Sequence, residues 1–124
     1  GNRVAAVLGD GKVARAEWAE MEREPGYRNV AELGLGILAD YGIAPVGELL
    51  LDEKLGLHVA FGRSDHFGGV TGPAQFSAPD RVVHIDRVYI PEVQPGVLVR
   101  AVDLHMKGGA IVPLMRDGRW VKRT

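Results

Sequence analysis

Four side chains with metal-binding chemistry fall in three segments that have the pattern of β-strands. Glu32 is in the first segment, His58 in the second, and His84 and Asp86 are in the third. Side chains alternate between the two faces of a strand, so we expect His84 and Asp86 to point the same way. Glu32, His58 and His84 also follow one another at equal spacing along the chain. Three successive strands would therefore each contribute to one site.

The ligand types restrict the metals that such a site would hold. Carboxylate and imidazole groups suit zinc, cobalt, manganese or ferrous iron. Two imidazoles and two carboxylates can hold one ion, or share two ions with ligands from elsewhere. The chain has no cysteine, so a thiolate zinc site and disulfide bonds are excluded.

Small residues next to two of the ligands strengthen the metal hypothesis. Glu32 shares its expected strand face with Gly34, and His58 shares its face with Ala60 and Gly62. Bulky apolar residues occupy the opposite faces. Small neighbours leave open space beside a ligand, which an ion and a substrate need.

Further acidic and imidazole groups lie close in sequence to these ligands. Glu53 comes at the end of an expected helix and would orient an imidazole N–H from the second coordination shell; the alternative is a simple charge pair with Lys54. Asp65 and His66 follow His58 in a loop that would overhang the site. Either one is a possible additional ligand or a proton-transfer group.

Composition indicates an ordinary globular chain. Its 124 residues are 46% hydrophobic and 25% charged, which predicts one domain spanning residues 1–124. A net charge of −1 argues against nucleic-acid binding. No apolar run approaches the roughly 20 residues of a membrane span, and no signal peptide is evident. The absence of cysteine suits a reducing cytoplasm, and the first residue, Gly1, suggests a processed or excised chain.

The pattern of residues predicts an α+β fold with a β-rich mixed or antiparallel sheet and two helices in the first half. Helix formers and stop signals predict the two helices, the second ending at Gly56 as its C-cap. Segment 37–45 is a short helical turn or a loop, and 63–79 is a long loop of the kind that is functional or mobile. The expected helices are 14–24 and 47–56, and the expected strands are 3–8, 28–36, 57–62, 82–90, 97–104 and a terminal hairpin turning at Arg116-Asp117-Gly118.

At the same residues the sequence resembles a known family. The strings NVAELGLG, LLLDEKLGLHVAFG with the following FGG, HIDRV and DGRWV are similar to the C-terminal part of thermophilic metalloaminopeptidases of the aminopeptidase T and aminopeptidase S type. They occur in the same order and at nearly the same spacing, over most of residues 28–121. Their joint occurrence is fairly specific, although each string alone is weak.

The resemblance implies a hydrolase that removes N-terminal residues from peptides. Its members use a pair of divalent metals to activate water against the peptide bond, which implies zinc, cobalt, manganese or magnesium here. Carried over by motif, the metal ligands are Glu32, His58, His84 and Asp86. Glu32 or Glu53 would be the catalytic general base.

The chain departs from the family pattern in two respects. Members have a tyrosine shortly after the middle histidine, where this chain has RSDH, so Asp65 or His66 would have to take over its role. Members are also much longer, and a further metal-binding glutamate comes from upstream of the matching part. The chain is then either a fragment or a short relative, and the sequence leaves open whether it is an enzyme.

Two other functions remain open at the level of sequence. The same resemblance extends to a ring-cleaving non-haem iron dioxygenase that acts on dihydroxypyridine and also has an H-x-D string. That chemistry uses two histidines and a carboxylate around ferrous iron. The other alternative is a non-catalytic metal-binding or dimerising module. Exposed strand edges seek partners, so we expect a homo-oligomer in every case.

Overall fold

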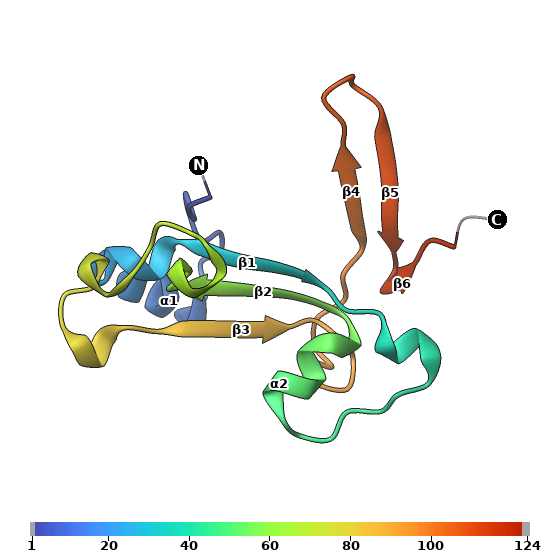
Figure 1. The fold of residues 1–124 in the computed structure, drawn as a ribbon, viewed down its shortest axis with the longest axis horizontal. Coiled ribbons are helices and arrows are strands. Elements are labelled where there is room, and N and C mark those ends of the chain that lie inside the picture. Colours follow the sequence, from blue (N-terminus) through green and yellow to red (C-terminus); the bar gives the residue numbers. More distant parts are fainter. Residues whose placement is uncertain (1, 123–124) are drawn as a thin grey trace. The chain divides into compact units, whose positions relative to one another are not determined.

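Two α-helices and two three-stranded antiparallel sheets form the fold in the computed structural model, which describes residues 2–122 (Figure 1). This confirms the predicted α+β class, with both helices in the first half of the chain. The α-helices are α1 (Lys12–Arg23) and α2 (Leu49–Asp52). The first sheet has the order β1-β2-β3, with β1 Val30–Leu35, β2 Leu57–Gly62 and β3 His84–Val88. The second has the order β4-β5-β6, with β4 Ala101–His105, β5 Ile111–Arg116 and β6 Arg119–Trp120.

Short 3₁₀ helices lie between these elements. They are η1 Pro25–Arg28, η2 Leu38–Tyr41, η3 Glu53–Leu55, η4 Asp65–Phe67, η5 Pro73–Gln75 and η6 Pro79–Arg81. The chain divides into two compact units, one of residues 2–33 and 59–87 and the other of residues 34–58 and 88–122. The residues of each unit pack mainly against other residues of the same unit. The single-domain organisation stays a prediction.

In the first unit, β2 lies between β1 and β3 and is hydrogen-bonded to both. Gly62 N donates to Asn29 O at 2.9 Å, and Arg63 N donates to Val83 O at 2.7 Å. Continued as a regular antiparallel ladder, the second bond places Ala60 opposite Asp86. Gly62 has a φ of +103°, and a Cβ on it would stand 2.2 Å from Val83 O. Glycine is therefore required at this point of β2, beside the backbone of Val83.

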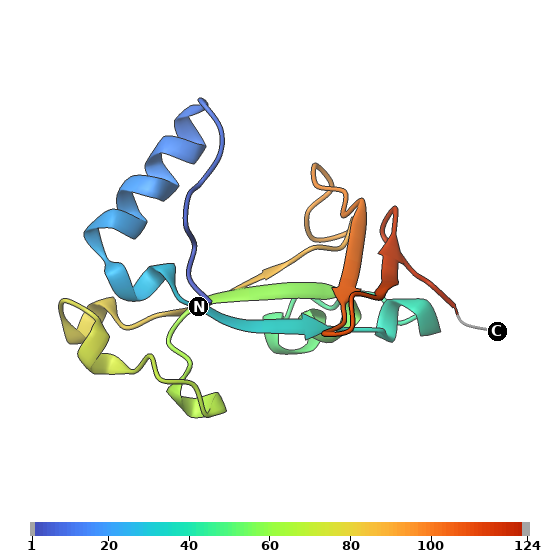
Figure 2. The same ribbon diagram turned by 90° about the horizontal axis from the view of Figure 1, so that it is seen from above.

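Helix α1 lies against the face of β3 opposite His84 and Asp86. Arg87 donates to Glu17 Oε1 at 2.7 Å and to Tyr27 Oη at 3.2 Å, and Tyr27 Oη donates to Glu17 at 3.1 Å. Because side chains alternate along a strand, Arg87 points away from its neighbour Asp86. Figure 2 shows α1 on one side of the first sheet and the loop that follows β2 on the other side. One face of the first sheet thus packs against α1, and the opposite face carries His84 and Asp86.

The second unit has a small apolar core of Leu55, Val88 and Ile90. Gly56 belongs to this packing, since a Cβ there would stand 2.2 Å from Ile90 Cγ2. Trp120 Nε1 donates to Gly36 O at 2.9 Å and ties β6 to the segment after β1. In the described residues, no helix has the length and apolar character to pass through a membrane.

Two expectations about secondary structure are wrong. Residues 3–8 do not form a strand: only Arg3 makes an isolated antiparallel bridge, with Asn29, because the mostly exposed residues after Val4 pair with no strand within residues 2–122. The expected helix 47–56 is divided into α2 and η3, and Gly56 is extended with a φ of −158° rather than a left-handed C-cap. The contact of Gly56 with Ile90, and not a helix end, explains the glycine.

Candidate metal centre

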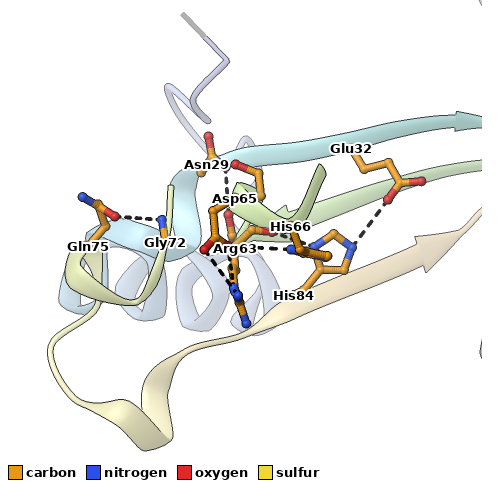
Figure 3. Close-up of polar contacts among 10 residues, drawn as sticks. Asn29, Glu32, Arg63, Asp65, His66, Gly72, Gln75 and His84 are labelled. Carbon is orange, nitrogen blue, oxygen red and sulfur yellow. Dashed lines mark hydrogen bonds and ion pairs between the residues drawn. The ribbon is translucent and has the colours of Figure 1, made fainter. Parts of the chain in front are cut away.

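The imidazole of His84, on β3, is held in one orientation by the chain that follows β2. Its Nδ1 lies 2.7 Å from the backbone oxygen of Arg63 (Figure 3). A carbonyl oxygen only accepts hydrogen bonds, so Nδ1 carries the proton and donates it. In the neutral ring, Nε2 then presents a lone pair. A backbone carbonyl on the far nitrogen is the arrangement that orients metal-binding histidines.

Two carboxylates face this Nε2. Glu32 Oε2 lies 3.6 Å away and Asp86 Oδ1 lies 3.7 Å away. One donor atom of each of the three residues lies within 4.8 Å of the others. The side chains are 26% exposed for Glu32, 19% for His84 and 8% for Asp86. Ligands at about 2.1 Å from a tetrahedral ion stand roughly 3.4 Å apart, so a shared cation fits the geometry without large movements.

Asp86 supplies the most informative atom of the cluster. Its Oδ1 is buried and has no hydrogen-bond donor among the described residues. Buried polar atoms are nearly always hydrogen-bonded, and an exception calls for an explanation. A cation held between the three groups would give Asp86 Oδ1 the partner that it lacks among the described residues.

The first sheet explains how the two acids come together. Glu32 is on β1 and Asp86 on β3, the two outer strands, and Ala60 on the central strand is fully buried. A residue as small as alanine at this position leaves room for the side chains of Glu32 and Asp86 to approach one another, with one oxygen of each within 4.8 Å of the other. The sequence pattern predicted this combination of acids and a small residue, and the ligation itself stays a prediction.

The loop after β2 brings His66, but not Asp65, against His84. The ring centroids of His66 and His84 are 4.9 Å apart in an edge-on arrangement. Asp65 instead pairs with Arg63, whose Nε donates to it at 2.5 Å. The hydrogen bond from Arg63 lowers the pKa of Asp65 below its ordinary value, and the same bond raises the pKa of Arg63. Neither Asp65 nor His66 belongs to a group of described residues that could share one ion.

The remaining predicted residues, His58 and Glu53, lie in the second unit. The imidazole of His58 is 3% exposed, and it fills the space beside Gly34, where a Cβ would stand 1.8 Å from its Cε1. Glu53 accepts a hydrogen bond from Lys54 Nζ, as in the alternative interpretation. That His58 is a ligand and Glu53 a general base stays a prediction.

Comparisons with known proteins identify no relative of this chain. No family model, no curated protein and no solved structure matches the chain. The likeness to metalloaminopeptidases therefore rests on its short strings alone. Together with the cluster of Glu32, His84 and Asp86, this likeness supports the function that we propose.

Two contributors to the site were missed in the sequence. The carbonyl oxygen of Arg63 leaves no trace there, because every residue has one. Phe67 has its ring centroid 5.6 Å from that of His84. It could have been noticed as the aromatic residue that directly follows Asp65 and His66.

Proposed function

We propose that Glu32, His84 and Asp86 bind a divalent metal ion and that the chain is the metal-binding part of an aminopeptidase. The observation that supports this best is the buried Asp86 Oδ1, which faces His84 Nε2 and has no hydrogen-bond donor among the described residues. One nitrogen and two oxygen ligands favour zinc, cobalt or manganese over magnesium, which prefers oxygen alone.

Each residue of the cluster has a distinct part in the proposed hydrolysis. Arg63 O fixes the tautomer of His84, so that Nε2 is directed at the ion. Asp86 is the most buried ligand and supplies negative charge where water has least access. Glu32 is the most exposed of the three and is placed to accept a proton from the attacking water. A bound divalent cation would polarise the scissile carbonyl and lower the pKa of a water ligand toward about 7.

Metal binding is the first test. Titration of zinc into metal-free protein, followed by calorimetry, should show binding that His84→Ala weakens about 100-fold or more. The matched control is His105→Ala, since His105 is an exposed histidine on β4. Its affinity should equal that of the original chain. Equal zinc affinity in His84→Ala and the original chain would contradict the proposal.

Activity is the second test. Cobalt- or zinc-loaded protein should release the anilide from leucyl-anilide, and Glu32→Gln should abolish this release. Metal binding without turnover would instead favour the non-catalytic metal-binding or dimerising module.

Anaerobic loading with ferrous iron, followed by air and a dihydroxypyridine, tests the alternative function as a ring-cleaving dioxygenase. We rank the dioxygenase lower, because the cluster joins one imidazole to two carboxylates and not two imidazoles to one.

The remaining proposals concern location and partners. A chain without cysteine needs no oxidising compartment, which supports a cytoplasmic location. A net charge of −1 supports peptides as substrates in preference to nucleic acids or anionic membranes. We also propose a homo-oligomer, because β4 is an edge strand of its sheet.

A further inference from the structure

The loop after β2 is closed tightly at its base. Ser64 N and Asp65 N both donate to Thr71 O, at 2.8 and 3.1 Å, and Gly69 N donates to Ser64 O at 2.9 Å. Ser64 and Thr71 are buried. A Cβ on Gly69 would stand 2.3 Å from Ser64 Oγ, so the two sides of the loop touch. These backbone hydrogen bonds hold the two ends of the tip, η4, together.

This tip carries an aromatic ring next to the candidate metal centre. The centroid of Phe67 lies 5.6 Å from that of His84 and 4.2 Å from that of His66. Phe67 is nevertheless 63% exposed. Apolar surface held open to water beside polar ligands is typical of ligand-binding sites, which combine apolar walls with a few directed polar groups.

The position of Phe67 matches one part of a substrate. A peptide whose first carbonyl is at the ion has its first side chain only a few bond lengths from that carbonyl. As a ligand, His84 would lie directly against the ion, and Phe67 lies against His84. An aromatic or branched aliphatic side chain in this place would bury itself on the exposed ring, and an aromatic one would gain an offset or edge-on ring contact as well.

We infer that Phe67 is a specificity-determining residue that selects substrates with an apolar first side chain. This inference rests on the proposed function, because the metal centre brings the substrate to the ring. His66 supports the ring from the side through its tilted contact at 4.2 Å. Phe67 touches the substrate side chain and takes no part in the chemical step.

Binding of chelating amino-acid derivatives tests the inference without catalysis. The probes are phenylalanine hydroxamate and glycine hydroxamate, titrated into zinc-loaded protein, because both carry the same metal-binding group. The original chain should bind the phenylalanine derivative about tenfold more tightly than the glycine derivative, a typical discrimination for an apolar contact. Phe67→Ala should bring this ratio close to one, and Phe67→Leu should retain part of it.

Val70→Ala is the matched control, since Val70 is exposed on the same loop, and its ratio should equal that of the original chain. The zinc affinity of Phe67→Ala should also be unchanged. Normal zinc binding with the same hydroxamate ratio in Phe67→Ala and the original chain would overturn this inference alone. Absence of zinc binding in the original chain would overturn the proposed function and this inference together.

Discussion

At the scale of single residues, Asp86 is the point where stability and proposed function conflict. A buried acceptor without a donor destabilises a fold by about 1–3 kcal/mol, and more when it is charged. Asp86 Oδ1 is such an acceptor among the described residues, and Glu32 adds a second carboxylate to the same cluster. A buried polar atom without a hydrogen-bond partner calls for an explanation, and a functional role is one such explanation.

Asp86→Asn should therefore stabilise the metal-free protein. The amide has no charge and offers an N–H to the neighbouring acceptors, so we expect the free energy of unfolding to rise by about 1 kcal/mol. Urea unfolding with a chelator present measures this. With zinc at 100-fold excess over its dissociation constant the order should reverse, because the original chain gains about 2.7 kcal/mol. Asp40→Asn, at an exposed position, is the control, and destabilisation of metal-free Asp86→Asn would refute the argument.

The pair of Arg63 and Asp65 gives a pH dependence with a definite sign. Arg63 lowers the pKa of Asp65 in the folded protein, so Asp65 holds its proton less firmly there than in the unfolded chain. The stabilisation is present above about pH 4, the unfolded value, and is lost as the pH falls through the lower folded value. Carboxyl NMR titration should show the pKa of Asp65 returning toward about 4 in Arg63→Gln. An unchanged pKa of Asp65 in Arg63→Gln would show that Arg63 does not lower it.

At the scale of elements, the alternation of side chains along the strands explains how each ligand reaches its face. Glu32 on β1, and His84 and Asp86 on β3, point to one face of the first sheet, while Arg87 points to α1 on the other. In the second unit, glycine on β1 gives the room that His58 on β2 occupies. The alternation along the strands thus determines which side chains share a face, and the small size of glycine determines where a large side chain fits.

Gly34→Ala tests the role of this glycine. The new methyl group would stand 1.8 Å from His58 Cε1, so the imidazole must move. We expect a loss of about 1–3 kcal/mol in the free energy of unfolding, as for other overpacked sites. Denaturant unfolding measures the loss, and the His58 ring signals in an NMR spectrum should shift. Gly108→Ala, where a Cβ meets nothing within 4 Å, should change neither quantity.

At the scale of the whole molecule, the two compact units raise the question of cooperativity. Strands β1 and β2 each contribute residues to both units. Because a strand is one continuous hydrogen-bonded element, we expect a single cooperative unfolding transition, with coincident fluorescence and circular dichroism curves. Two separate transitions would show that the units are independent domains.

Self-association is expected at the same scale. In the sheet order β4-β5-β6, no strand of residues 2–122 pairs with the outer edge of β4, and Leu104 on this strand is 46% exposed. Light scattering after gel filtration should give a multiple of the 13.4 kDa chain mass. Leu104→Lys should shift the equilibrium toward the monomer, because charged edge residues oppose strand pairing. A monomer at all concentrations in the original chain would exclude the oligomer.

The sequence by itself determined many of the local elements, although not the expected strand 3–8 or the helix end at Gly56, and it determined that His84 and Asp86 share a face. Period-two alternation requires His84 and Asp86 to share a face, and helix formers before Pro25 predict α1. The Asp117-Gly118 pair likewise predicts the final turn. These features depend on residues near one another in the chain, so composition and spacing reveal them.

Tertiary structure alone decided which distant groups meet. The carbonyl of Arg63 on Nδ1 of His84, the ring of Phe67 beside it and the extended Gly56 against Ile90 all depend on how separate segments pack. No local sequence pattern predicts a hydrogen bond to a backbone oxygen twenty-one residues away. The sequence shows only that the loop after β2 is rich in glycine and irregular. Whether one carboxylate oxygen is buried without a donor is likewise a property of the folded chain, because burial is a sum over all neighbours.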